Sequence, residues 1–557
     1  MPRPRRAAHR SVVARACRRP SLPCARRLGV AALAIALAAC TGGGAGERAG
    51  ERAGPQPRTG GTLAIALLDP GSLDPARAET LEDEIVVGNL FDGLTAIDPA
   101  GAVRPTVAAS WTSDPGLRHW EFRLRPDARF ADGSAVSAED FKFAWERLAD
   151  PKAKPRPSPS AGLLAPVTGY RAFAAGRAEQ IAGITAPDPA TLRVDLDRPF
   201  ADFPAAVASV ELSPLPHALV GGDPAAYLTR PVGNGPFRLA GRVRAGRPLV
   251  LERNPAYWGA AAHLDRVSVH LVPDELTAWL ELQNGRVAFA PVPADQVAAA
   301  AAVYGAAADG RSQPGLLQGP ALAVWQVGFD LRKRPASDPR WRQAFSLAID
   351  RRRVAAAVGG TVVPAASLVP PGTPAAGEPA ASGDLPCPAC AHDPARAKAL
   401  FAEVNAGSGP VTMQLPAGAV ERRIGELLAH DLAAAGLKLQ LKVSDDPKGT
   451  AALRLGPVAD YPRIDAFLHE QFSSRGSANR TGFRDAAVDR LLDQARGTAD
   501  EPARSGRYRQ AEAAILAELP AVPVLDARHS AVLAGGVEGF DLTPWGAVDL
   551  AAVSLST

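Results

Sequence analysis

The sequence predicts a mixed α/β protein with more than one domain, and three observations support this fold class. Its 557 residues exceed the length at which a single hydrophobic core keeps growing. Its composition is that of a globular protein, with 46% hydrophobic and 22% charged residues. Segments in which apolar residues alternate with period 2 are interleaved with segments of helical period, a pattern typical of sheets covered by helices.

The first 39 residues predict a signal peptide. A basic region ends at Arg26 and Arg27, an apolar run covers residues 28–37, and Leu37-Ala38-Ala39-Cys40 closes it. The run is too short to span a bilayer, which takes about 20 apolar residues. The closing tetrapeptide resembles the bacterial lipobox, in which the cysteine is acylated and becomes the first mature residue. The alternative is an alanine-rich segment that ends by chance in cysteine.

We therefore expect a lipid on Cys40 that anchors the protein to the outer face of the cell membrane or holds it in the periplasm. The paired arginines leave the Sec and twin-arginine export routes both open. Residues 40–59 are almost wholly small, polar or charged, so they cannot bury enough apolar surface to order themselves. They predict a flexible tether between the lipid and the folded domains.

The positive net charge comes from the signal peptide and does not indicate nucleic-acid binding. Residues 1–39 hold nine of the 62 lysines and arginines and no acidic residue. Without them, 53 basic residues stand against 58 acidic ones, so the mature chain has no excess of cations to follow a phosphate backbone.

Several segments predict individual strands and helices. In residues 119–125, Trp120, Phe122 and Leu124 alternate with polar residues and predict a strand with one buried face. A capping-box sequence at 137–140 then predicts the start of a helix with an apolar stripe. Similar patterns predict strands around 192–196, 267–271 and 437–443, and two further helices, one after Asp338 and one that ends before Gly436. The apolar stripe of the helix after the capping box is Phe141, Ala144, Trp145 and Leu148. The stripes of the other two helices are Trp341, Ala344, Phe345 and Ala348, and Ile424, Leu427, Leu428 and Leu432.

Short motifs in a fixed order resemble the extracellular solute-binding proteins of family 5, the oligopeptide- and dipeptide-binding proteins of ABC importers. Single motifs are weak, but together they extend from about residue 60 to residue 540. They include Ser72-Leu73-Asp74-Pro75, Asn89-Leu90-Phe91-Asp92-Gly93-Leu94, Phe130-Ala131-Asp132-Gly133, Gly233-Asn234-Gly235-Pro236-Phe237, Asn254-Pro255-Ala256-Tyr257-Trp258, Asp338-Pro339-Arg340-Trp341 and Ala459-Asp460-Tyr461-Pro462.

The resemblance implies a two-lobed fold of the periplasmic binding-protein kind (type II, the large cluster-C type), with a hinge and a ligand cleft between the lobes. We expect residues 60–330 to form the first part of lobe I, residues 331–522 to form lobe II, and residues 523–557 to return to lobe I. Two chain crossings make the hinge, and closure buries the ligand. It also implies a small peptide ligand, membrane permease subunits as partners and a monomeric protein.

The resemblance implies a set of ligand-binding residues as well. Asp460 lies where relatives hold the α-ammonium group of a peptide, and Arg454 matches their neighbouring arginine. By the same comparison Asp69 adds a second acidic contact. Without the resemblance, Asp460 is a solvated acid before a Tyr-Pro turn. A charge taken into a closed cleft needs a partner, which is why a carboxylate is expected there.

Four further residues lie near these positions or near the first crossing and are candidates for the cleft wall. They are Tyr461, Phe472, Asn479 and Trp325, and for each of them packing or loop capping is the competing interpretation. No residue is assigned to the ligand's carboxylate. Some family members bind nickel chelates, haem, sugars or opines, so a non-peptide solute stays open, as does a role in peptide sensing or adhesion.

Two cysteines remain after Cys40, in Cys387-Pro388-Ala389-Cys390. Such a pair is a redox dithiol, half of a metal site or a disulfide. A metal site needs a second pair of ligands and a redox dithiol needs a thioredoxin-like context, and neither pattern is visible. In an oxidising compartment the disulfide is favoured.

Enzyme motifs are missing from the sequence. There is no Gly-x-Ser-x-Gly elbow and no phosphate-binding loop, and Ser473 stands where a zinc protease beginning at His469-Glu470 would place its second histidine. We therefore expect a binding protein with no catalytic residue, no cofactor and no metal.

Overall fold

A computed structural model describes residues 58–78, 80–153, 157–222, 224–244, 246–376, 387–404, 410–444, 453–458 and 461–556. All of them belong to one compact unit, Pro57–Thr557. The predicted signal peptide, Cys40 and Asp460 lie outside the described residues, as does nearly all of the predicted tether. Within the described part, no helix combines the length and the apolar character that a membrane span requires.

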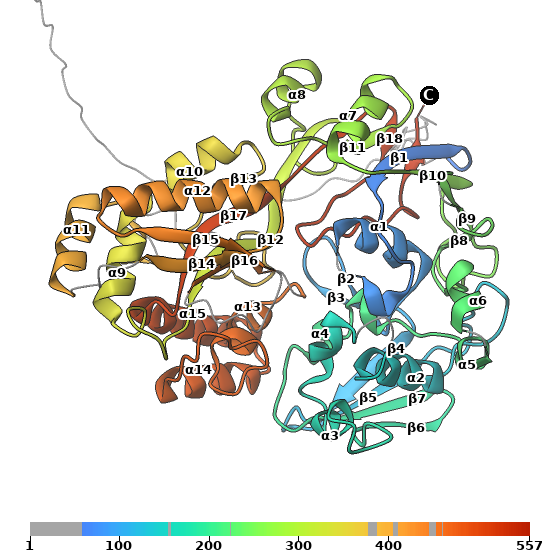
Figure 1. The fold of residues 1–557 in the computed structure, drawn as a ribbon. Helices are drawn as coiled ribbons and strands as arrows, with labels where there is room; N and C mark the ends of the chain where they lie inside the picture. The colour runs from blue at the N-terminus through green and yellow to red at the C-terminus, as the bar shows by residue number, and fades with distance from the viewer. Residues whose placement is uncertain are drawn as a thin grey trace, which may run out of the picture. The chain divides into compact units, whose positions relative to one another are not determined.

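A large mixed sheet runs through the unit (Figure 1). Its central strands β12 and β17 are antiparallel, whereas β1 pairs with β10 and β14 with β15 in parallel. In order across the sheet the strands are β15 (Leu439–Val443), β14 (Val411–Leu415), β16 (Leu453–Val458), β12 (Gly315–Phe329), β17 (Ala521–Leu533), β11 (Phe289–Pro291), β1 (Thr62–Leu68), β10 (Arg266–Val272), β9 (Leu249–Arg253) and β8 (Phe237–Leu239), with β13 (Val362–Pro364) also paired to β17.

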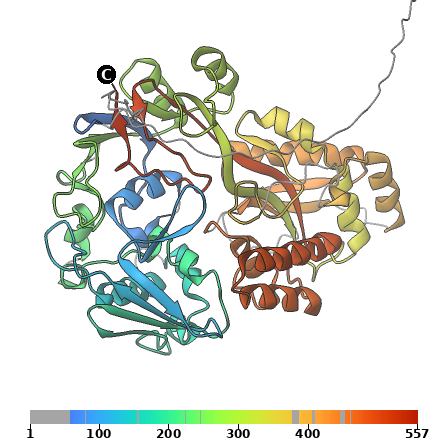
Figure 2. The same ribbon diagram turned by 180° about the vertical axis from the view of Figure 1, so that it is seen from behind.

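The hydrophobic core changes along the two long strands. On β12, Leu317 belongs to the first core and Leu322 to the second. On β17, Leu525 belongs to the second core and Ala531 to the first. Figures 1 and 2 show β12 and β17 running side by side between the two parts of the molecule. The chain therefore crosses from one core to the other within β12 and returns within β17.

Pairing between these strands is interrupted where the core changes. Pro320 lies opposite Arg528, and the next paired residue on β12, Val324, lies opposite Asp526. Residues 321–323 of β12 thus bulge against a single residue of β17. The predicted boundaries at 330/331 and 522/523 lie just after β12 and within β17, and they stay predictions.

The first core holds a four-stranded antiparallel sheet and the helices around it, and the predicted patterns are confirmed here. Trp120, Phe122 and Leu124 are buried in β5, and the predicted helix at 138–149 buries its whole stripe. Ser137 and Asp140 form the predicted capping box, which fixes the start of that helix. The strands are β4 (Ala108–Ser113), β5 (His119–Leu124), β7 (Thr191–Asp195) and β6 (Ile184–Asp188), with the two-stranded sheets β2 (Thr95–Ile97) with β3 (Val103–Pro105) and β18 (Val537–Glu538) with β19 (Ser554–Leu555) nearby.

Short helices connect and cover these strands. In chain order they are η1 (Pro75–Arg77), α1 (Leu81–Leu90), α2 (Ala138–Ala149), η2 (Pro159–Leu164), α3 (Tyr170–Ala174), α4 (Phe203–Ala206), η3 (Val210–Leu212), α5 (His217–Gly222) and α6 (Pro224–Thr229). A third, smaller core lies under α7 (Glu275–Gln283) and α8 (Val297–Tyr304), where Trp279 and Val297 are buried.

The second core lies between helices and the β14–β16 part of the large sheet. The predicted stripe of α9 is fully buried, as is that of α12, which ends before Gly436 with its positive φ of 96°. β15 is an edge strand, so its predicted buried face is only partly covered and Val443 is exposed. The helices are α9 (Pro339–Ala348), α10 (Arg351–Val358), η4 (Pro388–Cys390), α11 (Pro394–Glu403), α12 (Ala419–Ala434), α13 (Ile464–Phe472), α14 (Ala486–Arg496) and α15 (Glu501–Glu518).

Candidate ligand-binding site

A cavity of about 1170 Å³ is lined by residues that pack with both large cores. Ligand pockets commonly measure about 300–1,000 Å³, so this cavity has room for a ligand of several residues. Its walls come from distant parts of the chain: α1 and the loop after it, η2, the η3 region, residues 321–323 of β12, positions 461–462, 470, 477–478 and 496, and residues 544–549 and 551–552.

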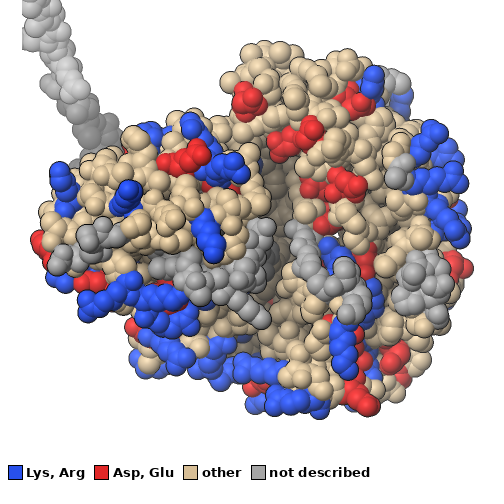
Figure 3. Space-filling model, viewed as in Figure 1, with Lys and Arg blue, Asp and Glu red and all other residues tan. Residues whose placement is uncertain are grey.

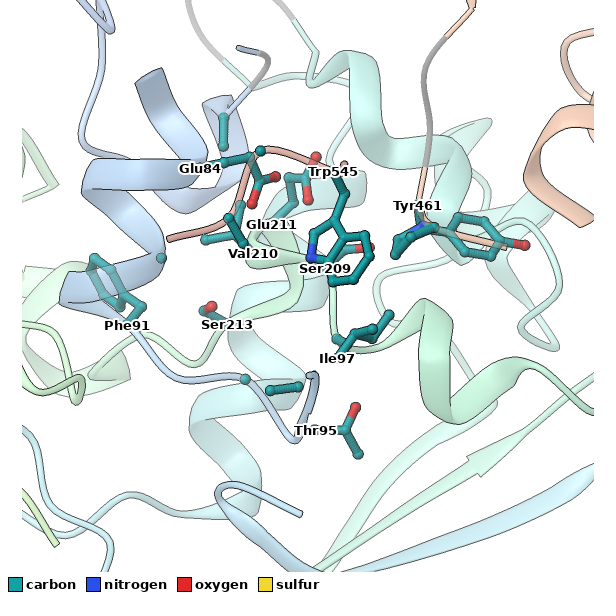
Figure 4. A pocket seen from close by; sticks show the side chains of 18 of the residues that line it. Glu84, Phe91, Thr95, Ile97, Ser209, Val210, Glu211, Ser213, Tyr461 and Trp545 are labelled. Carbon is teal, nitrogen blue, oxygen red and sulfur yellow. The ribbon is translucent and has the colours of Figure 1, made fainter. Parts of the chain in front are cut away.

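Aromatic and aliphatic side chains form part of the wall (Figure 4). Phe91 and Val210 belong to the first core, Ile97 ends strand β2, and Trp545 comes from the chain that follows β17. Tyr461 lies to the right of Trp545 in the same view, on the opposite side from Phe91, and its ring packs edge-on to Phe200 with centroids 6.4 Å apart. These surfaces can cover the apolar parts of a ligand.

Tyr461 is held in place by a buried polar cluster behind the wall. Its hydroxyl donates a 2.6 Å hydrogen bond to Asp465, and the Tyr508 hydroxyl donates one of 2.8 Å to the same carboxylate. Burial raises the pKa of Tyr461 well above its ordinary value, so the hydroxyl keeps its proton. Burial alone would also raise the pKa of Asp465, but Arg496 outweighs it, and the carboxylate stays charged.

The charged side chains among the described lining residues are mostly acidic. Two arginines stand there, and both have acidic partners: Arg104 Nε lies 2.6 Å from Asp98, and Arg496 Nη2 lies 3.0 Å from Glu470. The acidic lining residues are Glu84, Asp92, Asp98, Glu211, Glu470 and Asp549. Figure 3 shows acidic side chains gathered around the upper part of the hollow in that face and basic ones along the lower edge.

Two of these carboxyls have strongly raised pKa values. Burial raises the pKa of Asp92 to about 7, and Asp549 adds to the shift. Burial also raises the pKa of Glu84 well above its ordinary value, and the negative charges of Glu211 and Asp83 raise it further. A positively charged group in this part of the cavity would oppose both effects.

Of the residues predicted to bind the ligand, one lines the cavity and others lie elsewhere. Tyr461 lines the cavity. Asp460 lies outside the described residues. Arg454 is in β16, where its backbone pairs with Gly328 of β12. Asp69 is exposed just after β1, where its side chain accepts a hydrogen bond of 3.0 Å from the Gly71 amide, and it is not among the lining residues.

The other three candidate residues hold a loop or pack in the core and do not line the cavity. Asn479 donates to the carbonyls of Ser473 and Phe483 and so closes the loop after α13. Trp325 is 9% exposed and Phe472 is 1% exposed, and both pack in the second core. None of Asn479, Trp325 and Phe472 is among the residues that line the cavity, although residues 321–323, just before Trp325, are.

Sequence reasoning missed the acidic part of the wall. Glu84 belongs to the run Glu82-Asp83-Glu84 at the start of a helix, where acidic residues are usual because they complement the helix dipole. Glu211 stands alone in a short 3₁₀ helix. Neither position carries a sequence signal, because the two helices meet only in the folded chain.

Cys387 and Cys390 are joined by a disulfide, with an S–S distance of 2.08 Å, at the edge of the second core. Arg351 Nη1 donates a 2.9 Å hydrogen bond to the Cys390 carbonyl. Among the described residues, no group of three or more His, Cys, Asp or Glu side chains is placed to hold a metal ion.

Comparisons with known proteins agree with this architecture. A family model described as bacterial extracellular solute-binding proteins, family 5 Middle, matches residues 102–479. The probable deoxycholate-binding periplasmic protein YgiS of Escherichia coli K12 is 30% identical, with 85% of this chain and 89% of YgiS covered. The periplasmic murein peptide-binding protein MppA of the same strain is 29% identical, with the same coverage.

The solved structure of the Escherichia coli murein tripeptide binding protein MppA has a TM-score of 0.73 and 26% identity to this chain, and it covers 89% of this chain and 98% of its own. This likeness confirms the predicted two-lobed α/β fold class. The relatives are binding proteins, not enzymes. The chain therefore belongs to the bacterial extracellular solute-binding proteins of family 5.

Proposed function

We propose that this protein captures short peptides outside the cytoplasm and delivers them to the permease of an ABC importer. The observation that carries the proposal is the cavity of about 1170 Å³ lined from both cores, because a two-lobed binding protein holds its ligand in such a position. The relative MppA, which is named for murein peptide binding, supports a peptide as the ligand.

A non-peptide solute is the second candidate, because YgiS is named a probable deoxycholate-binding protein. Deoxycholate is an anion with a large apolar body. Both arginines among the described lining residues are already paired with acidic side chains, so neither is available to bind the carboxylate of deoxycholate. A peptide that carries an ammonium group suits this lining better.

The lipid anchor at Cys40 and the residue roles from the family resemblance belong to the same proposal. Asp460 would hold the peptide's α-ammonium group, with Arg454 beside it. The protein would act as a monomer on the outer face of the membrane. Mass spectrometry of the protein from its native membrane would show an acylated N-terminal Cys40, and Cys40→Ala would release the protein from the membrane fraction.

Isothermal calorimetry and native mass spectrometry of residues 57–557 test the ligand. We expect di- to pentapeptides to bind with one peptide per protein and to remain intact, and deoxycholate to bind much more weakly. Binding of deoxycholate with no binding of any peptide would overturn the proposal in favour of the second candidate. Hydrolysis of a bound peptide would overturn the assignment as a binding protein.

A further inference from the structure

One corner of the cavity is lined by two glutamates and a serine from two segments of the chain, α1 and the η3 region. Glu84 comes from α1, Glu211 from η3, and Ser213 follows η3 directly. Figure 4 shows the side chains of Glu84 and Glu211 next to each other, with Val210 just below them and Ser213 below Val210. Burial raises the pKa of Glu84, and the nearby charge of Glu211 raises it further, as expected for two neighbouring carboxyl groups.

The capping of α1 explains why Glu84 and not its neighbour serves the cavity. Asp83 accepts a 2.8 Å hydrogen bond from the Thr80 amide and completes the capping box at the start of the helix. Asp83 is therefore used for local structure. Glu84 is the next residue, lines the cavity, and takes part in none of the ion pairs formed by the described residues. On the other side, Glu211 accepts a 3.1 Å hydrogen bond from Ser160 Oγ.

Ser213 supplies an independent sign that a polar ligand group belongs in this corner. Its side chain is 1% exposed and lines the cavity, and within the described part of the chain its Oγ has no hydrogen-bond partner. Buried polar atoms nearly always have a partner, and leaving one without costs about 1–3 kcal/mol. The exceptions tend to lie where a ligand completes the bonding.

The chemistry of the corner selects the class of ligand group. Two carboxylates so close together repel an anion and are stabilised by a cation. The described residues offer no cluster suited to a metal ion, which favours an organic cation. Phe91, Val210 and Trp545 lie around the corner and can cover an aliphatic stem, as the chain of a lysine or arginine requires.

We propose that Glu84, Glu211 and Ser213 form a subsite for the ammonium or guanidinium group of a basic side chain of the bound ligand. The inference rests on the proposed function, in that it takes the ligand to be a peptide, and adds a preference for peptides that contain lysine or arginine. The carboxylates pair with the cation, and Ser213 Oγ accepts a hydrogen bond from it.

The test compares a lysine-containing tripeptide with the same peptide in which norleucine replaces lysine, both N-acetylated so that no α-ammonium group contributes. Calorimetry on the wild type is expected to show about 10- to 100-fold tighter binding of the lysine peptide, the range for a hydrogen-bonded charge pair. Glu84→Gln should remove most of this preference and leave the norleucine peptide bound as tightly as before or more tightly. Ser213→Ala should reduce the preference by a smaller factor.

Glu82→Gln is the matched control, since Glu82 lies in the first turn of the same helix and does not line the cavity. It should keep the full lysine preference, and thermal melting would verify that each variant is folded.

Equal binding of the two peptides to the wild type, or an unchanged preference in folded Glu84→Gln, would overturn the subsite while leaving peptide capture intact. An effect of Glu84→Gln seen only with non-acetylated peptides would assign the corner to the α-ammonium group and overturn the side-chain proposal. Failure of the wild type to bind any peptide would instead refute the proposed function.

Discussion

Asp465 of α13 and Arg496 of α14 form a doubly hydrogen-bonded ion pair inside the protein, with Nε–Oδ1 and Nη2–Oδ2 distances of 2.8 and 2.6 Å. Their side chains are 0% and 6% exposed. The pair borders the cavity, because Arg496 is one of its lining residues and Asp465 accepts a hydrogen bond from the hydroxyl of Tyr461, which also lines it. Stability and the shape of the site are therefore linked through one carboxylate.

Replacement of Asp465 by alanine is expected to lower the free energy of unfolding by about 3–5 kcal/mol, because it leaves the Arg496 guanidinium buried without its main partner. Urea denaturation followed by tryptophan fluorescence measures this change. Glu121→Gln is the control: Glu121 pairs with Arg193 on the surface, and such pairs contribute about 0–1 kcal/mol. Similar losses in the two variants would show that burial of the Asp465 pair carries no special weight.

Substitution of Trp325 tests whether this side chain packs in the core or contacts the ligand. Its side chain is 9% exposed in the second core and does not line the cavity. Trp325→Ala is expected to cost about 3–5 kcal/mol of stability through the space it leaves. The peptide dissociation constant, measured by calorimetry well below the melting temperature, should stay that of the wild type. A clear loss of affinity in the folded variant would return Trp325 to the ligand site.

Asp526 predicts a specific dependence of stability on pH. Burial raises the pKa of this β17 carboxyl to about 8, and Glu512 contributes to the shift. A carboxyl with a higher pKa in the folded state than its unfolded value of about 4 binds its proton more tightly when folded. The folded state therefore loses stability as pH rises from about 4 to about 8, and the loss is complete above that range.

Asp526→Asn cannot ionise and should escape this loss. Relative to the wild type, the variant is expected to gain at least about 1 kcal/mol more at pH 9 than at pH 5, as measured by chemical denaturation at both values. A difference between the two proteins that is the same at both pH values would show that Asp526 does not titrate in this interval.

Asp460 carries the proposal for the α-ammonium group. Asp460→Asn is expected to weaken free-amine peptides by about 1.5–3 kcal/mol, the worth of a charge-assisted hydrogen bond, and to affect N-acetylated peptides much less. Calorimetry with matched pairs of peptides measures both. Equal losses for the two classes would exclude Asp460 from this role.

Local patterns predicted much of the fold. The alternation at 119–124 and the stripe at 141–148 are determined by burial within single elements, so the sequence was sufficient to find β5 and α2. For β15 the same pattern predicted a buried face that is only partly covered, because its position at the sheet edge depends on the whole topology. The local sequence pattern predicts that an element forms, whereas the elements packed around it determine how far its side chains are buried.

The cavity could not be predicted in the same way. Phe91, Tyr461 and Trp545 share its wall although Phe91 lies 370 positions before Tyr461 and Trp545 lies 84 positions after it. The sequence suggests Asn479 because it follows Asp460 and Trp325 because it lies near the first crossing, but Asn479 closes a loop and Trp325 packs in the second core. Only the folded chain shows that the acidic end of α1 meets η3.

Residues 321–323 of β12 lie at the interruption in its pairing with β17 and also line the cavity. These residues lack regular strand partners, and the Leu322 amide donates a 2.9 Å hydrogen bond to the Pro544 carbonyl next to Trp545. The pairing shifts again between Trp325, which lies opposite Leu525, and Gln326, which lies opposite Pro523. A ligand in the cavity would therefore contact the segment in which β12 passes from the first core to the second.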